Sequence, residues 1–359
     1  MPDYRVIPYT ADRLPDVEAL WREHVNDDEA VASRRRYFQW LTERNPSRFG
    51  ASPYYLLMDG NRVIGMHGHM PQQISVGGKP QRCFLAHDDL LAVECRGKGL
   101  GAVMLAGVAE QEDSFAGALW HNAPNLKLYA KCGWTDLSRL KSWVLIVDPT
   151  RNIEARLGQN ALASALSAVL RQLLAMRAAL LPAGRGTAYR VAEVARFDAA
   201  FDALFERTAP ALPIAVARTS AYLNWKFVEK PGNRYRRLAA YDSSGVLRAY
   251  AVVTGGKQEK APIGSILDLL GDPGHPEALD AVLRSGLAWL RSQGVVEVSC
   301  VGSERALARL GRFGFRQRPS TTGFMFRNWE QVFGKDFVGN IDNWYITGSD
   351  ADGDAWKPT

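Results

Sequence analysis

The sequence predicts an α/β chain, with α+β layering, that contains two copies of one fold. Apolar runs of strand length alternate with helix-like segments along both halves of the chain. An aromatic and proline signature also recurs at a constant interval. The two signatures are Tyr37-x-x-Trp40-x5-Pro46 and Tyr222-x-x-Trp225-x5-Pro231. We therefore predict a tandem duplication of one layered fold.

The same order of elements follows each signature. Strand–turn–strand patterns cover residues 54–65 in the first half and residues 238–252 in the second. A further strand and a helix follow in both halves. Each half then ends near a glycine–aromatic pair, which is Gly133-Trp134 or Gly314-Phe315.

The composition is that of an ordinary globular protein. Of the 359 residues, 47% are hydrophobic and 23% are charged, and the net charge of +6 suits an anionic ligand. No dense basic run concentrates this charge, so we expect no nucleic-acid partner. The N-terminus lacks the regions of a signal peptide, and the four cysteines form no CxxC pair, which predicts a cytoplasmic protein with reduced thiols. His67-Gly68-His69 resembles half a metal site without a second pair of ligands, and we expect no metal.

A glycine-rich turn at residues 96–101 is the most specific motif of the chain. Its sequence is Arg96-Gly97-Lys98-Gly99-Leu100-Gly101. The apolar run that ends at residues 90–93 predicts a strand before the turn, and residues 102–109 predict a helix after it. Unpaired N–H groups of the helix N-terminus, the helix dipole and the two basic residues would together hold an anion such as a pyrophosphate.

The spacing of this turn separates it from other phosphate-binding loops. The order Arg-x-x-Gly-x-Gly is neither the dinucleotide fingerprint nor a P-loop. It resembles the coenzyme A loop of the GNAT superfamily of acyl-CoA-dependent N-acyltransferases, and Arg96, Gly99 and Gly101 match that motif. The residues that match the second signature of the family are Asn125, Tyr129, Gly133 and Trp134.

The resemblance implies tandem GNAT-like domains, each a mixed, mostly antiparallel sheet flanked by helices. The predicted divisions are a catalytic domain at 1–148, an apolar helical linker at 149–196, a degenerate copy at 197–335 and a C-terminal tail at 336–359. We call the anion-binding turn at residues 96–101 the cradle. In the second copy, Asp272 and Glu277 lie at the equivalent place and would repel phosphate. Two prolines there also lack N–H donors. We expect this copy to have lost coenzyme A.

The resemblance also implies acetyl-CoA as the co-substrate. The expected coenzyme A site comprises Leu91, Ala92, Val93, Arg96, Gly97, Lys98, Gly99, Leu100, Gly101, Ala102, Asn125 and Tyr129. Backbone N–H groups of the strand before the turn would polarise the thioester carbonyl and stabilise the oxyanion.

Tyr129 is the expected general acid, because a phenol with a pKa of about 10 can protonate a departing thiolate. It lies four residues after Asn125 on a predicted helix, so the two side chains share a face. The candidate bases are Asp88, His87 and Asp89, at the head of the strand that enters the turn. Strand alternation sends Asp88 to one face of the sheet and the other two to the opposite face. Asp88 ranks first, because similar proteins carry Asp at that distance from the cradle arginine.

These residues predict acetyl transfer to a primary amine of a small molecule, for which an amino sugar is one candidate. Direct attack in a ternary complex is favoured, because no Cys or Ser occupies a nucleophile motif. The alternatives are a longer-chain acyl-CoA N-acyltransferase and a non-catalytic acyl-CoA-binding sensor or scaffold. The apolar segment 161–181 is interpreted as a linker helix packed across both halves. Its alternative interpretations are a helix in peripheral contact with a membrane and a lid over an acyl tunnel.

Overall fold

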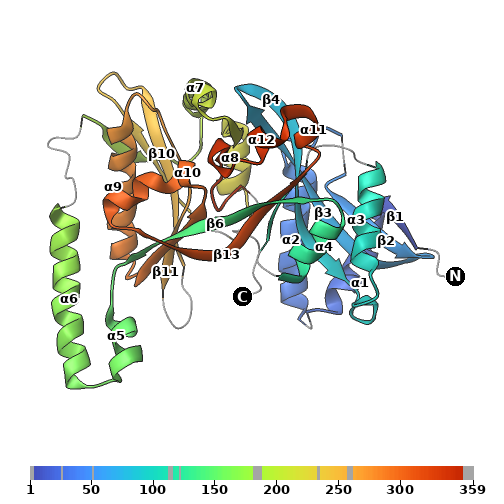
Figure 1. Ribbon diagram of the computed structural model, residues 1–359, viewed down its shortest axis with the longest axis horizontal. Helices are drawn as coiled ribbons and strands as arrows, with labels where there is room; N and C mark the ends of the chain where they lie inside the picture. The colour runs from blue at the N-terminus through green and yellow to red at the C-terminus, as the bar shows by residue number, and fades with distance from the viewer. Residues whose placement is uncertain are drawn as a thin grey trace.

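Two units of sheet and helix lie side by side in the molecule (Figure 1). The computed structural model describes residues 4–25, 27–50, 52–111, 116–120, 123–180, 188–232, 235–256 and 262–350. The first unit contains β1 (Tyr4–Pro8), α1 (Leu14–Arg22), α2 (Asp28–Arg44), β2 (Tyr54–Asp59), β3 (Arg62–Val76), β4 (Lys79–Leu91), α3 (Leu100–Gln111), β5 (Ala116–Trp120), α4 (Ala123–Lys131) and β6 (Thr135–Ile146). The strand and helix predicted on either side of the glycine turn are therefore confirmed as β4 and α3.

The second unit repeats this order after a helical connection. The connection comprises α5 (Thr150–Leu157) and α6 (Ala161–Leu180). The unit contains β7 (Arg190–Glu193), α7 (Ala199–Thr208), β8 (Ile214–Val216), α8 (Ser220–Phe227), β9 (Arg236–Tyr241), β10 (Leu247–Gly256), β11 (Ile263–Gly271), α9 (Pro276–Ser292), β12 (Glu297–Gly302), α10 (Glu304–Leu307) and β13 (Arg316–Arg327). The C-terminal part adds α11 (Glu330–Phe333), α12 (Lys335–Val338) and β14 (Trp344–Tyr345).

The strands form one hydrogen-bonded path through both units. Their order is β1-β2-β3-β4-β5-β13-β6-β12-β11-β10-β9-β7. Most neighbours are antiparallel, and the parallel pairs β4–β5 and β11–β12 occupy matching places in the two units. The predicted class, tandem layers of mixed and mostly antiparallel sheet with flanking helices, is confirmed.

The two units exchange their last strands. β6 belongs to the first unit in sequence but pairs with β12, whereas β13 belongs to the second unit and pairs with β5. The two exchanged strands also pair with each other, so they join the halves of the sheet. The predicted boundaries at 1–148 and 197–335 therefore divide the chain but do not divide the sheet.

The repeated aromatic signature lies at the contact between the units. The rings of Trp40 and Trp225 stack with centroids 4.4 Å apart and planes inclined by 10°. Each indole N–H donates to the backbone carbonyl of the other tryptophan, at 2.9 Å from Trp40 and 3.3 Å from Trp225. Equivalent residues that form a reciprocal pair are expected at the axis that relates two copies of a fold. The two tryptophans of the signature therefore join the units.

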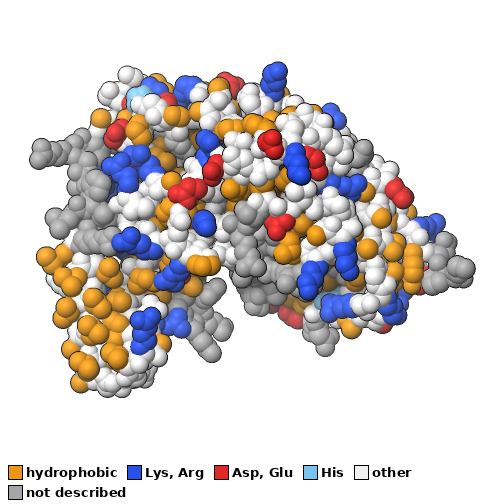
Figure 2. All heavy atoms as spheres, viewed as in Figure 1, with side chains coloured by type: hydrophobic (Ala, Val, Ile, Leu, Met, Phe, Trp, Pro, Cys, Tyr) orange, Lys and Arg blue, Asp and Glu red, His pale blue; other side chains and the backbone are white. Residues whose placement is uncertain are grey.

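The linker helix α6 lies at one edge of the molecule and packs mainly against α5 (Figure 1). Its outer face exposes Leu162, Val169 and Leu173 by 68%, 57% and 53%. Apolar side chains accordingly gather over this helix in Figure 2. The prediction that this segment packs across both halves is therefore wrong. No helix in the described part of the chain is long and apolar enough to cross a membrane.

Residues 336–350 are integrated into the fold, although the sequence analysis assigns them to a tail. β14 pairs with β8, which in turn pairs with β3 of the first unit. Both carboxylate oxygens of Asp350 accept hydrogen bonds from the buried guanidinium of Arg218, at 2.8 and 2.9 Å. The segment predicted as a tail is therefore part of the fold as far as Asp350, and residues 351–359 lie outside the described part.

Candidate functional site

Strands β4 and β5 separate beside the glycine turn. They pair in parallel register from Phe84 to Ala86, and among the described residues no further ladder partner of β4 lies on β5. A cavity of about 200 Å³ opens between β4, α3 and α4. Its lining includes Asp89, Leu91, Arg96, Gly101 and Asn125. Predicted residues from three elements thus meet around one cavity.

The backbone of the glycine turn suits an anion cradle. Gly97 and Gly99 have φ values of +74° and +77°, in the left-handed region that favours glycine. Gly101 is needed for a different reason, because a Cβ there would lie 2.8 Å from the Leu128 side chain. α3 can therefore approach α4 closely, and its first turn begins at the glycine turn with N–H groups that have no partner within the helix.

Arg96 adds a positive charge at the rim of this cavity. Its guanidinium lies 2.8 Å from Nδ1 of His24, just after α1. Burial and the charge of Arg96 lower the pKa of His24, which favours the neutral ring that can accept this hydrogen bond. Glu94 pairs with Arg62 at 2.6 Å, so this acidic neighbour does not neutralise Arg96.

A β-bulge in β4 coincides with the candidate bases. On β3, Gly68 is opposite His87 and Met66 is opposite Leu90, so β4 carries one extra residue between these pairs. Asp88 has a φ of +50°, a left-handed conformation that Asp adopts more readily than most residues. The extra residue changes the direction of the side chains that follow it.

The bulge overturns the expected strand alternation. His87 and Asp88 both contact Tyr54, with ring centroids 5.1 Å apart for His87 and a 3.4 Å hydrogen bond to Asp88. Asp89 instead accepts a hydrogen bond from Tyr129 on α4. The expectation that His87 and Asp89 share a face opposite Asp88 is wrong, because regular alternation holds only for an unbulged strand.

Asp89 bridges an imidazole and a phenol. Its Oδ2 accepts a 2.8 Å hydrogen bond from the Tyr129 hydroxyl, and its Oδ1 lies 2.6 Å from Nδ1 of His67. The Asp89 side chain is 29% exposed, whereas that of His67 is 1% exposed. Tyr129 is buried, and its ring packs edge-on against Trp134 at 4.7 Å. Tyr129, Asp89 and His67 therefore form a chain of polar contacts, and its central member, Asp89, lines the cavity.

Asp88 is held by a different set of contacts. Its Oδ1 lies 2.5 Å from the guanidinium of Arg34 on α2, and its Oδ2 accepts from the Tyr54 hydroxyl. Burial raises the pKa of Asp88, whereas the charge of Arg34 lowers it. These contacts tie α2 and β2 to the bulge, so the Asp88 environment is that of a structural ion pair.

His87 is buried behind the bulge. Gly68 makes room for its ring, because a Cβ at that position would lie 2.5 Å from it. Burial, and secondarily the charge of His67, lower the pKa of His87 to about 3. Its Nε2 has no hydrogen-bond partner among the described residues. A histidine with this pKa binds a proton poorly at neutral pH and would be a weak base.

His67 contacts Asp89 in the site, but the motifs of the sequence indicate it only as part of a metal-like pair. The missed signal is the turn Gly77-Gly78 between β3 and β4, in which both residues have positive φ. A two-residue turn of this kind fixes the register of a hairpin. Counting back from it places His67 beside the acidic pair of β4. Within the described residues, no group of three His, Cys, Asp or Glu side chains could hold a metal ion.

Comparison with known proteins gives similarity at the level of structure. No family model and no curated protein matches the chain. Saccharomyces cerevisiae N-myristoyltransferase with bound myristoyl-CoA is similar over 91% of this chain and 79% of that chain, with 13% identity and a TM-score of 0.58. A probable N-acyltransferase from Enterococcus faecalis V583 is similar over 90% and 72%, with 13% identity and a TM-score of 0.60.

A GCN5-related N-acetyltransferase from Anabaena variabilis gives a similar result. It covers 90% of this chain and 72% of its own, with 15% identity and a TM-score of 0.60. Similarity over 90% or more of the chain extends to both units. The chain has the tandem GNAT fold that its sequence predicts.

Proposed function

We propose that the protein is an acyl-CoA-dependent N-acyltransferase that transfers acetyl from acetyl-CoA to a primary amine of a small molecule. One observation carries this proposal: Asp89, which accepts a hydrogen bond from Tyr129, lines the cavity beside the glycine turn. Acid–base groups and an anion cradle are the two parts that acyl transfer from a thioester to an amine requires. An amino sugar remains one candidate acceptor.

The cradle and the separated strand would bind the two ends of the donor. N–H groups of the turn between Gly97 and Gly101, together with the charges of Arg96 and Lys98, suit a pyrophosphate, whereas the N–H of Ala102 already donates to the Gly99 carbonyl at 3.0 Å. The edge of β4 beyond Ala86, where β5 no longer pairs with it, offers backbone groups to a pantetheine arm and a thioester carbonyl. Of the residues predicted for this role, Ala92 and Val93 already donate their N–H groups to the Ile64 carbonyl and the Glu23 carboxylate, at 2.9 and 3.2 Å. The cradle and this edge would fix the carbonyl carbon near Asp89 and Tyr129.

The acid–base pair would move protons in a closed sequence. Asp89 accepts a proton from the attacking amine as the C–N bond forms and the C–S bond breaks. Tyr129 gives its hydroxyl proton to the departing thiolate and regains a proton from Asp89 across their hydrogen bond. His67 orients the Asp89 carboxylate from the other side. We place Asp89 ahead of Asp88 and His87 as the base, because Asp89 contacts both Tyr129 and the cavity.

A longer-chain acyl donor is the second candidate, which the similarity to N-myristoyltransferase bound to myristoyl-CoA favours. The alternative in which α6 forms a lid over an acyl tunnel does not support a long-chain donor. Among the described residues, none from α6 lines the cavity beside the glycine turn. The chain length of the donor is therefore a question for binding experiments.

Calorimetric titration with acetyl-CoA, and then with a long-chain acyl-CoA, tests the proposal. Gly99→Glu should abolish micromolar binding, because it strains a positive φ and places a carboxylate in the cradle. Gly245→Glu is the matched control, since Gly245 has a φ of +78° in the β9–β10 turn. Equal loss in both variants would contradict the cradle assignment.

Turnover by Tyr129→Phe separates an enzyme from a non-catalytic sensor or scaffold. Removal of the phenol hydroxyl should lower kcat by about 10²–10⁴-fold while acyl-CoA affinity is retained. Retained affinity without any measurable turnover in the unaltered protein, over a panel of small amines, would favour a sensor. An unchanged rate in the variant would remove Tyr129 from the mechanism.

A further inference from the structure

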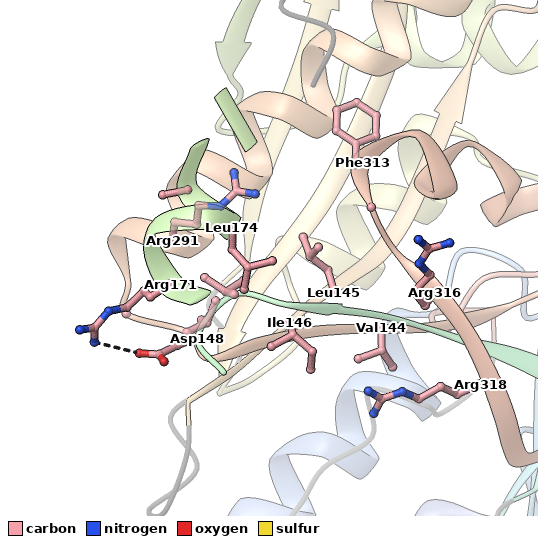
Figure 3. Close-up of a pocket in the computed structure, with 15 residues that line it drawn as sticks. Val144, Leu145, Ile146, Asp148, Arg171, Leu174, Arg291, Phe313, Arg316 and Arg318 are labelled. Atoms are coloured by element: carbon pink, nitrogen blue, oxygen red, sulfur yellow. Dashed lines mark ion pairs between the residues drawn. The ribbon is translucent and has the colours of Figure 1, made fainter. Parts of the chain in front are cut away.

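A second cavity lies between the linker helix α6 and the exchanged strands β6 and β13 (Figure 3). It has a volume of about 450 Å³. As lined by the described residues, it shares no side chain with the cavity beside the glycine turn. Its apolar wall includes Val144 and Ile146 of β6, Leu174 of α6 and Phe313. It is therefore a separate compartment with its own chemistry.

Four arginines surround the apolar wall in Figure 3. They are Arg171 of α6, Arg291 in the last turn of α9, and Arg316 and Arg318 of β13. The acidic residue of the lining is Asp148, which lies 3.6 Å from Arg171. Within the described ranges of the chain, no carboxylate lies within 4 Å of the other three guanidinium groups. Positive charge therefore exceeds negative charge in this cavity.

Arg316 and Arg318 are exposed, so they place positive charge at the solvent side of the cavity. Arg316 and Arg318 are two residues apart on one strand, so their side chains share a face of the sheet. Arg316 is opposite Val144 on β6, which places this charge beside the apolar wall. Burial lowers the pKa of Arg291, so its charged form has lost part of its hydration. A bound anion would compensate for this loss.

We propose that this cavity binds an amphiphile in which a phosphate or carboxylate group is joined to an aliphatic chain. Guanidinium groups present paired N–H donors that match phosphate and carboxylate oxygens. The side chains of Val144, Ile146, Leu174 and Phe313 offer an apolar surface for the chain. A volume of about 450 Å³ is in the range of small-ligand sites. The site is independent of the proposed acyl transfer.

Calorimetric titration with decyl phosphate, below its critical micelle concentration, is the direct test. Inorganic phosphate supplies the anion without the chain, and decyltrimethylammonium supplies the chain without the anion. We expect decyl phosphate to bind at least about tenfold more tightly than either, since the site uses both parts of the ligand. Equal affinity for the cationic amphiphile, or for inorganic phosphate, would overturn the proposal.

Arginine variants locate the binding. Arg316→Gln/Arg318→Gln should weaken decyl phosphate binding by about 10–100-fold, because each lost charge-assisted contact is worth roughly tenfold. Arg48→Gln is the matched control, because Arg48 is an exposed arginine of the first unit. Arg291→Gln is a second, single-site variant that should also weaken binding. Unchanged affinity in these variants would refute the site.

Thermal unfolding distinguishes a binding role from a structural one. Without ligand, Arg316→Gln/Arg318→Gln should keep or raise Tm, because the change removes like-charge repulsion. A large fall in Tm would show that these arginines stabilise the fold instead. Leu173→Ser on the outer face of α6 should leave decyl phosphate affinity unchanged. Loss of binding in this variant would assign the signal to adsorption on the exposed helix and would overturn the proposal.

Vesicles identify the source of the ligand. Sedimentation with phosphatidylcholine vesicles, with and without 30% phosphatidylglycerol, would show binding only to the anionic vesicles if the natural ligand is a lipid headgroup. Decyl phosphate binding without vesicle binding would indicate a soluble amphiphile. Either result supports the site when the arginine variants abolish it. Vesicle binding that persists in Arg316→Gln/Arg318→Gln would contradict it.

Discussion

The glycine turn of the first unit and its counterpart in the second occupy the same place in the strand order but differ in chemistry. In the first unit, Gly99 adopts a positive φ and leaves the backbone N–H groups accessible, and Arg96 supplies positive charge. In the second unit, β11 ends before Asp272, whose carboxylate pairs with Arg248 at 2.9 Å, and α9 starts with Pro276. The Asp272 carboxylate also accepts the Gly274 N–H at 3.0 Å, and Pro276 has no N–H, so this turn offers a phosphate fewer donors. The two units therefore share the strand and the helix at this place but not the residues of the turn between them.

The bulges of the two units, by contrast, have a cluster of the same residue types beside them, although its members occupy different positions on the strands. β11 also has a register shift opposite β10, and each unit holds an aspartate beside its bulge between an arginine and a tyrosine. The clusters are Asp88 with Arg34 and Tyr54, and Asp268 with Arg218 and Tyr250. Because clusters of these residue types occur in both units, we attribute the Asp88 cluster to the stability of the fold and not to the binding of a ligand. Asp89 has no such counterpart, because Leu269 follows Asp268.

The largest expected effect separates the two neighbouring carboxylates. Asp89→Asn should lower kcat by about 10²–10⁴-fold, because an amide of the same shape cannot take the amine proton. Steady-state kinetics with acetyl-CoA and an accepted amine would measure this loss. Calorimetric affinity for acetyl-CoA should change little, since the cradle is untouched.

Asp88→Asn is the matched control for that experiment. It should reduce stability through the contact with Arg34 but retain most of kcat. A greater loss of kcat in Asp88→Asn than in Asp89→Asn would reverse the assignment. The base would then be the aspartate whose cluster has a counterpart in the second unit, and not Asp89.

The second prediction concerns the buried cluster of the second unit. Asp268 and Arg218 are both fully buried, at 0% exposure, and their closest side-chain atoms are 3.1 Å apart. Asp268→Asn should lower the free energy of unfolding by about 3–5 kcal/mol, because it leaves a buried guanidinium without one of its charged partners. Urea denaturation would measure the change.

Asp88→Asn should cost less stability than Asp268→Asn, because the Asp88 side chain is 25% exposed and water partly replaces the lost contact. Acetyl-CoA binding by folded Asp268→Asn should be unchanged. An equal loss of stability in the two variants would show that burial does not distinguish these clusters.

Much of the fold was predictable from local patterns in the sequence. The tandem repeat, the strand and helix around residues 96–101 and the layered class are properties of spacing, which a sequence records directly. The exchange of β6 and β13 was not predictable, because pairing between distant strands leaves no local signature. The exposure of α6 was missed for a similar reason. An apolar helix was assumed to be covered, and coverage depends on tertiary contacts.

The candidate site was predictable in position but not in detail. Asp89, Arg96 and Asn125 line one cavity, as motif spacing suggests. The order of the acidic candidates came from the family resemblance. Their assignment to faces of the sheet depended on regular alternation, which a bulge of one residue reverses locally. His67 becomes a partner of Asp89 only once the hairpin register is known.

The smallest effect is a pH dependence that belongs to the first unit alone, since β11 has no histidine. The folded pKa of His87 is about 3, against 6.5 for an exposed histidine. The unfolded chain therefore binds more protons between these values, so stability falls as pH drops below about 6.5. At pH 5 the loss should be about 2 kcal/mol, at 1.36 kcal/mol per pH unit. His87→Asn should remove this part of the slope in urea denaturation at several pH values, whereas His275→Asn in the second unit should leave it. An unchanged slope in His87→Asn would place the acid sensitivity elsewhere, with buried His69, whose pKa burial also lowers, as the next group to replace.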